Sequence, residues 1–224
     1  MNKISKNRIK AFTLAEVLVT LMVIGVVAAL TIPSLIQSYQ DNSNRVAFKK
    51  IYSSINQATL MIMSDNGGTM KGLTIDGHNF AKLYEDQFRI IKSCPAASLP
   101  GNCWHNANDW YYLNGNAVGE SNAVGFITTN GSFFYIQRLT PTPDCGNAAY
   151  VYPACALITV DVNGWKIPNT VGKDIFKVYV TENGIKPFGL PNTHEMLEMC
   201  VVGSTLANNL GLGCSYKILN NEDY

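Results

Sequence analysis

The stretch KAFTLAEVLVTLMVIGVVAALTIPSL, residues 10–35, decides the fold of this chain. From Phe12 to Ile36 the only charged side chain is that of Glu16. An α-helix rises about 1.5 Å per residue, so a helix over this range can cross a hydrocarbon core of about 30 Å. The sequence therefore predicts a membrane-spanning helix over residues 12–36.

The residues before this helix predict its orientation. Residues 1–11 carry four basic side chains and no acidic one, and the next basic residue is Arg45. The positive-inside rule then predicts a cytoplasmic N-terminus and an exported C-terminal body. The apolar run is longer than the roughly 7 to 15 residues of a cleavable secretory signal. A plain uncleaved signal anchor stays open as an alternative, although it leaves Glu16 unexplained.

The composition of the chain excludes few classes of binding partner. The 224 residues are 47% hydrophobic and 15% charged with a net charge of +1, which suits a real core in one or two domains. Without the four basic residues of the leader, the chain holds 13 Lys and Arg against 16 Asp and Glu. This excess of acid argues against nucleic acid as a partner of the main body, except in a competence filament.

Glu16 is the residue of the apolar run that needs an explanation. An ionised side chain within lipid costs several kcal/mol and is usually paired or functional. One interpretation places Glu16 close enough to the cytoplasmic interface to stay hydrated. The other gives it a function, and the residues around it favour this second interpretation.

The order of features here resembles the N-terminus of type IV pilins and of type II secretion pseudopilins. It has a short basic leader, a small residue, Phe-Thr-Leu-x-Glu and an apolar helix that contains proline. In that family a prepilin peptidase cuts after the small residue and methylates the new amine. The resemblance, which covers about the first 60 residues, implies cleavage between Ala11 and Phe12 and N-methylation of Phe12. Ala11 departs from the family's usual glycine.

The resemblance also implies roles in assembly for Glu16 and Pro33. Glu16 would neutralise the freed amine of Phe12 in a neighbouring subunit, because an unpaired charge in low dielectric costs far more than a pair. Pro33 removes one helical hydrogen bond. It is either a flexible joint used during assembly or a marker of the membrane exit with Ser34, and both interpretations stay open.

Past Ile36 the pattern remains helical and becomes amphipathic, with apolar residues at spacings of three to five. The run Asp65-Asn66-Gly67-Gly68 is a strong stop, so the helix is expected to end near Ser64. The apolar positions are Val46, Ile51, Ile55, Ala58 and Ile62.

The expected fold class is α+β, with a long N-terminal helix packed on an antiparallel sheet, as the resemblance implies, and with disulfide-stapled loops. The expected segments are a cleaved leader at 1–11, a transmembrane and assembly helix at 12–36, an amphipathic half at 37–65 and an exported head at 66–224.

Asn-Gly pairs between β-rich runs predict three hairpins in the head. These pairs are Asn130-Gly131, Asn163-Gly164 and Asn183-Gly184. Residues 81–93 fit either a short helix or a helix that turns into a strand. The stretch 141–155 and the tail from 191 are expected to be irregular, with a short helix around 193–202.

The six cysteines all follow residue 90, and none forms a CxxC pair or a zinc-like spacing with His. An even number in an exported segment favours disulfides. Pairing in sequence order is the simplest connectivity, although sequence alone does not determine it. The cysteines are Cys94, Cys103, Cys145, Cys155, Cys200 and Cys214.

The stretch DVNGWKIPNTVGKDIF, residues 161–176, has two interpretations. Asp161, Asn163 and Asp174 offer hard oxygen ligands, and it resembles head loops of pilin-like proteins, among which major pseudopilins bind calcium. The stretch lacks the further acids of an EF-hand, and Trp165 stands where another ligand would be expected. The favoured interpretation is a hairpin turn in which the two aspartates cap nearby amides. No other cofactor is expected.

The sequence does not predict an enzyme. It contains no GxSxG, HExxH, P-loop or dinucleotide motif. The histidines His78, His105 and His194 are scattered and are expected at the surface or in loops.

Three functions follow from these observations. The first is a structural subunit of a type IV pilus or a type II secretion pseudopilus. Its partners would be homologous subunits, the prepilin peptidase and an inner-membrane assembly platform. The second is a minor or tip pilin that acts as an adhesin or a DNA-uptake module. The third is a single-pass membrane protein that never polymerises. The expected location is the inner membrane, with the head periplasmic or extracellular, and then a filament.

Overall fold

The computed structural model describes residues 12–73, 77–119, 123–138, 145–146, 153–191, 197–201 and 210–222. The chain divides into two compact units, an anchor unit of Met1–Asn42 and a head unit of Ser43–Tyr224. Helix α1 (Leu14–Asp65) contributes its first part to the anchor unit and its second part to the head unit.

Helix α1 ends where the sequence predicts a stop. Gly67 and Gly68 have φ angles of 66° and 89°, which belong to the left-handed region that favours glycine. The Gly68 N–H donates to the Met63 carbonyl at 2.7 Å, a bond that satisfies one of the last helical carbonyls. The Asp-Asn-Gly-Gly sequence therefore ends the helix at Asp65, one position after the expected Ser64.

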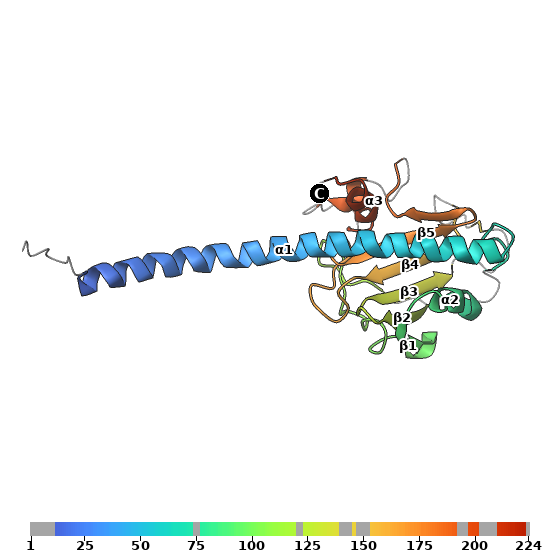
Figure 1. The fold of residues 1–224 in the computed structure, drawn as a ribbon, viewed down its shortest axis with the longest axis horizontal. Coiled ribbons are helices and arrows are strands. Elements are labelled where there is room, and N and C mark those ends of the chain that lie inside the picture. Colours follow the sequence, from blue (N-terminus) through green and yellow to red (C-terminus); the bar gives the residue numbers. More distant parts are fainter. Residues whose placement is uncertain are drawn as a thin grey trace, which may run out of the picture. The chain divides into compact units, whose positions relative to one another are not determined.

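The head unit is built on a six-stranded antiparallel sheet in which each strand pairs with the next along the chain (Figure 1). Helix α2 (Gly77–Glu85) leads into it. The strands are β1 (Ile90–Cys94), β2 (Val124–Thr128), β3 (Phe133–Arg138), β4 (Ala156–Asp161), β5 (Ile175–Thr181) and β6 (Gly184–Pro187). Short helices η1 (Ala96–Ser98), η2 (Leu197–Cys200) and α3 (Cys214–Leu219) complete the described elements.

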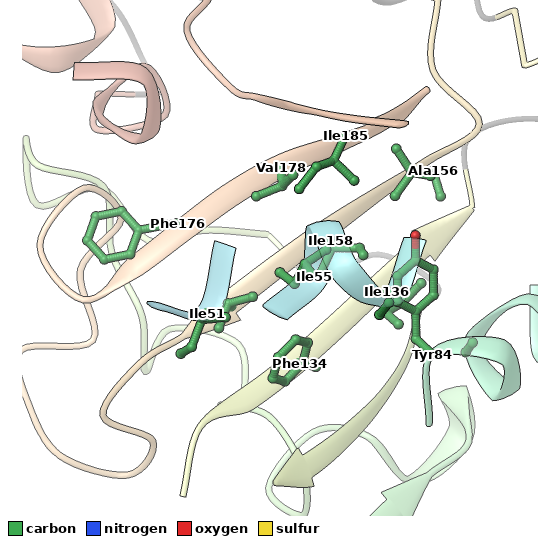
Figure 2. Packing of buried hydrophobic residues seen from close by; sticks show 14 of the residues in the cluster. Ile51, Ile55, Tyr84, Phe134, Ile136, Ala156, Ile158, Phe176, Val178 and Ile185 are labelled. Atoms are coloured by element: carbon green, nitrogen blue, oxygen red, sulfur yellow. The ribbon is translucent and has the colours of Figure 1, made fainter. Parts of the chain in front are cut away.

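One face of the sheet packs against the second part of α1 (Figure 2). The Phe48 ring stacks on Phe176 of β5 with centroids 4.4 Å apart. The buried hydroxyl of Thr59 lies 2.9 Å from the hydroxyl of Tyr84, which pairs two polar groups inside the core. The buried apolar residues of α1 recur at helical spacing and are Phe48, Ile51, Ile55, Ala58 and Ile62.

A second apolar cluster covers the opposite face of the sheet. Its aromatic residues include Trp104 and Trp110 from the loop after η1, which lie in edge contact at 5.5 Å. Tyr179 of β5 stacks on Phe188 at 4.4 Å. Because both faces are covered, β4 is buried at every position, including those of the polar residues Thr159 and Asp161.

The three disulfides join the cysteines in sequence order, which is the simplest pairing. The pairs are Cys94–Cys103, Cys145–Cys155 and Cys200–Cys214. The structure thus has the predicted α+β pilin-like fold, with a long helix, an antiparallel sheet and disulfide-held loops.

Two of the three predicted hairpins are present. Strands β2 and β3 pair around Asn130-Gly131, where Gly131 has a φ of 86°. Strands β5 and β6 also form a hairpin, in which Thr181 pairs with Gly184, so Gly184 begins the second strand.

The hairpin predicted at Asn163-Gly164 is wrong. Strand β4 does pair with β5, but residues 162–174 form a long connection and no strand begins at Trp165. The physical reason is the Asp161 carboxylate, which accepts the N–H groups of Asn163 and Gly164 at 3.0 and 2.8 Å. These bonds turn the chain away from the sheet before a second strand can pair.

The structure describes part of the segments for which the sequence predicts short or irregular elements. Residues 81–93 contain the end of α2 and most of β1, so the helix that turns into a strand is correct. In the predicted short helix at 193–202, η2 occupies Leu197–Cys200, and residues 192–196 and 202–209 lie outside the described residues. Most of 141–155 also lies outside them.

Candidate functional site

The first turn of α1 places Glu16 against Thr13. The N–H and the hydroxyl of Thr13 each donate to Glu16 Oε2 at 2.8 Å. In return, the Thr13 hydroxyl oxygen accepts the Glu16 N–H at 3.2 Å. This reciprocal pattern is a capping box, with Thr13 as the N-cap and Glu16 as the third residue of the helix.

The capping box explains part of the placement of Glu16. Within a single chain the carboxylate satisfies two donors of its own first turn, and its negative charge is favourable at a helix N-terminus. The Thr-x-x-Glu spacing of residues 13–16 is a known signature of this cap, so this contact was predictable from the sequence.

Phe12 lies next to this cap and is exposed. An amine freed at Phe12 would therefore lie at the same helix end as Glu16. Ala11 and the basic leader, and with them the predicted cleavage point, lie outside the described residues.

The surface of α1 that follows is apolar and uncovered. No residue of its most hydrophobic window is buried, and the helix is long and apolar enough to cross a membrane. In a water-filled compartment such a surface would be unfavourable by about 25 cal/mol per Å² of apolar area. Lipid or the apolar helices of other chains can cover it.

Pro33 lies inside α1, and the helix continues through it. Proline has no N–H, so the carbonyl four residues earlier, that of Ala29, loses its helical donor. On either side of Pro33, the hydroxyls of Thr31 and Ser34 donate to the Val27 and Thr31 carbonyls at 2.9 Å. The backbone is therefore weakened at one position of a helix that is otherwise regular.

The three candidate calcium ligands come together at the base of the β4–β5 connection. Asp161 and Asp174 are completely buried. The Asp174 carboxylate accepts the N–H of Asn169 at 2.9 Å and that of Thr170 at 2.6 Å. It also accepts the Asn163 side-chain amide at 3.1 Å.

The arrangement of these residues does not fit a calcium ion. Ca²⁺ takes about six to eight oxygen ligands. Here N–H donors or His105 face all four carboxylate oxygens of Asp161 and Asp174. Among the described residues no group of three or more His, Cys, Asp or Glu could hold a metal. The two aspartates accept backbone N–H groups on either side of the loop. The hairpin turn that the favoured interpretation combined with these caps is absent.

His105 is a buried member of this cluster. It lies in the loop after η1, so of the two predicted positions, surface or loop, the loop is correct and the surface is wrong. Its Nε2 lies 2.7 Å from Asp161 Oδ2, and its side chain is almost fully enclosed. Neither its neighbours in sequence nor its spacing from Asp161 indicated this contact, which depends on the fold. His78 lies in α2, and His194 lies outside the described residues.

Burial raises the pKa values of both aspartates. For Asp161, the hydrogen bond and the charge of His105 and two backbone N–H groups oppose the rise in pKa. For Asp174, burial first and then the neighbouring charge of Asp161 raise the pKa to about 7, despite three hydrogen bonds that lower it. The Asp174 carboxyl is therefore the group of the loop base that is expected to titrate near neutral pH.

Comparison with known proteins identifies the N-terminal segment. A family model described as the prokaryotic N-terminal methylation motif matches residues 6–32. This range contains Thr13 and Glu16 and ends just before Pro33. No curated protein and no solved structure matches the chain.

Proposed function

We propose that this chain, which carries the N-terminal signature of type IV pilins and pseudopilins, is a structural subunit of a pilin-like filament. The motif over residues 6–32 is the observation that carries the proposal. It coincides with an apolar helical surface that the described part of the chain leaves uncovered. In a type IV pilus or a type II secretion pseudopilus, the same surface of other subunits would cover it.

Processing is the first step of the proposed function. A prepilin peptidase cuts between Ala11 and Phe12 and methylates the amine of Phe12. The cut removes the basic leader, whose charges oppose movement of the helix out of the membrane. It also creates a cation at the start of an apolar helix.

Glu16 then changes partner. In a single chain its carboxylate is bonded to Thr13. In the filament it neutralises the Phe12 amine of a neighbouring subunit, and an unpaired charge in this environment would cost about 3 to 5 kcal/mol. This difference selects the register in which neighbouring helices stack. Pro33, with its missing hydrogen bond, can serve as a joint for this movement.

The disulfides and the leader support the proposed location. The protein is anchored in a membrane by a single apolar helix. All six cysteines are paired in the head, as expected for an oxidising compartment, and the leader is basic. We place the leader in the cytoplasm and the head in the periplasm or outside the cell, with the inner-membrane assembly platform as a further partner.

The motif indicates a structural protein rather than an enzyme. A minor or tip subunit that binds a surface or DNA is the second candidate. The retained Glu16 favours a subunit that stacks within a filament over one that only starts it. A single-pass protein that never polymerises is the third candidate.

Mass spectrometry of the mature N-terminus tests the proposal. The chain is co-expressed with a prepilin peptidase, and we expect it to begin at methylated Phe12. Ala11→Gly serves as the matched control, because it restores the usual small residue and should be cut at least as fully. A chain that still begins at Met1 in both forms would overturn the proposal.

A further inference from the structure

The β4–β5 connection presents two large apolar side chains to solvent. Trp165 is 53% exposed and Ile167 is 81% exposed, and the exposed Lys166 stands between them. We call residues 165–167 the loop tip. In water this exposure is unfavourable, since burying such side chains gains about 1.5 to 3 kcal/mol each.

The loop tip is held in place at its base. Asp161 accepts the N–H groups of Asn163 and Gly164, and Asp174 accepts those of Asn169 and Thr170. These bonds lie on both sides of the tip. The apolar side chains are therefore exposed on a loop whose two ends are fixed by hydrogen bonds.

The indole ring of Trp165 is also positioned. It makes edge contacts with Phe133 at 4.6 Å and with His105 at 5.4 Å between ring centroids. One side of the ring thus rests on buried residues of the head unit, while about half of the side chain faces outward.

The loop tip belongs to the end of the head unit at which the chain enters from the anchor. Asp161 at the end of β4 pairs with Ile175 at the start of β5. The next residue, Phe176, stacks on Phe48, the first buried apolar residue of α1. The connection that carries Trp165 therefore lies at the same end of the sheet as Phe48.

A short tether keeps this end near the membrane. The apolar run ends at Ile36, and Asn44 is the first buried residue of α1. The chain between them spans about 12 Å as a helix and at most about 29 Å fully extended. The length of the chain alone therefore limits the separation of Ile36 and Asn44 to about 29 Å.

The chemistry of the loop tip matches a lipid surface. Tryptophan is enriched at membrane interfaces, where its ring is apolar and its N–H can remain hydrated. An isoleucine can enter the upper acyl region, and a lysine can place its amine among phosphates while its stem stays apolar.

We propose that the loop tip of Trp165, Lys166 and Ile167 docks on the lipid surface of the membrane that holds the apolar part of α1. The docking rests on the membrane anchoring in the proposed function, but not on cleavage or polymerisation. It holds the head unit against the membrane before assembly and is released when the subunit leaves the bilayer.

Tryptophan fluorescence tests this docking directly. The chain has three tryptophans, and Trp104 and Trp110 are buried, so lipid-borne quenchers report on Trp165. The uncut full-length protein is reconstituted in vesicles of phosphatidylethanolamine and phosphatidylglycerol, with or without a lipid that carries a doxyl group near the headgroup. We expect doxyl lipid to quench the emission and Trp165→Phe to abolish this quenching.

Matched variants distinguish docking of the loop tip from non-specific adsorption of exposed apolar side chains to lipid. Ile167→Ser should reduce the quenching, whereas Ile91→Ser should not, although Ile91 on β1 is 68% exposed. Equal emission with and without doxyl lipid would overturn the docking. So would a Trp165 signal that responds only to filament formation, because the partner would then be a second copy of the chain.

The failure of docking and that of the proposed function are distinguishable. The measurement uses the uncut chain, so a defect in cleavage or assembly leaves the quenching intact. Conversely, a chain that is processed and polymerises normally but shows no quenching would contradict the docking alone.

Discussion

Glu16 serves two partners with one carboxylate. In the single chain both donors of Thr13 reach the same oxygen, Oε2. Loss of an N-terminal cap costs about 1 kcal/mol, whereas an uncompensated charge in an apolar interface costs about 3 to 5 kcal/mol. The charge should therefore dominate the effect of a substitution.

Glu16→Ala should leave the protein processed and membrane-bound but largely absent from filaments. Glu16→Gln is the informative control, because it keeps an acceptor for Thr13 and loses only the charge. We expect both variants to fail in incorporation, measured as the fraction of processed protein in sheared filaments. Normal incorporation of Glu16→Gln would show that assembly into filaments depends on the helix cap and not on the charge of Glu16.

Asp174 predicts a pH dependence of the head. Its pKa is raised by burial to about 7, above an unfolded value of about 3.9. Between these values the folded state binds more protons than the unfolded state. The contribution of this group to stability is thus present at low pH and is lost as the pH rises towards 7, by at most about 1.4 kcal/mol per pH unit.

Asp174→Asn cannot titrate and keeps an oxygen that can accept the Thr170 N–H. We expect its unfolding free energy to fall less than that of the parent between about pH 5 and 7. Chemical unfolding at a series of pH values measures the difference. Parallel curves for the two proteins would refute the assignment of this pH dependence to Asp174.

The same loop gives a prediction about calcium. Asn163 Oδ1 and Asn169 Oδ1 are buried and accept no hydrogen bond among the described residues, so two oxygens are available to a cation or a water. The carboxylates, however, are occupied by N–H donors. We expect no calcium-dependent change in melting temperature. A calcium-dependent rise that Asp161→Ala removes would restore the calcium interpretation.

At the scale of elements, α1 joins the head through a narrow set of buried side chains. Ile55 is fully buried between the helix and the sheet (Figure 2). Ile55→Ala should lower the unfolding free energy by about 2 to 5 kcal/mol, because it removes apolar contacts and leaves a cavity. Thermal unfolding in detergent measures the loss.

Leu60→Ala is the matched control on the same helix, since Leu60 is 53% exposed. Its effect should stay within about 0.5 kcal/mol, as for most surface substitutions. An equal loss for both variants would mean that helix propensity, and not packing on the sheet, sets the stability of this part of α1.

The sequence predicts elements where local chemistry decides the structure. The helix stop after Asp65 and the hairpin at Asn130-Gly131 depend on residues next to each other, and both are present. The hairpin at Asn163-Gly164 is absent because Asp161 and the distant Asp174 hold the chain in a loop. Helix α3 has only six residues, too few for a periodic pattern, and its first residue is fixed by the Cys200–Cys214 disulfide.

The residues of the functional site also fall into two groups: those that the sequence alone located, and those whose contacts depend on the fold. The Phe-Thr-Leu-x-Glu motif consists of five consecutive residues, so the sequence alone located it. The contact of His105 with Asp161 joins residues far apart in the chain and required the fold. The apolar loop tip could not be predicted either, because exposure of Trp165 depends on what the rest of the head covers.

At the scale of the whole molecule, the chain combines a covered core with an uncovered helix. The head unit buries both faces of its sheet and pairs all its cysteines. Among the residues that the structure describes, none buries the most apolar part of α1. Head-to-tail contacts that do not close generate helical filaments, and such contacts between many copies can cover this surface.

Crosslinking in assembled filaments tests this account most directly. The native cysteines are all paired, so introduced thiols are the free ones. Chains with Leu14→Cys are co-expressed with chains with Val17→Cys, beside a control pair of Leu14→Cys and Ile36→Cys. The account predicts oxidised dimers in filaments for the first pair alone. Filaments that give no dimer with the first pair, or equal dimer with both pairs, would contradict it.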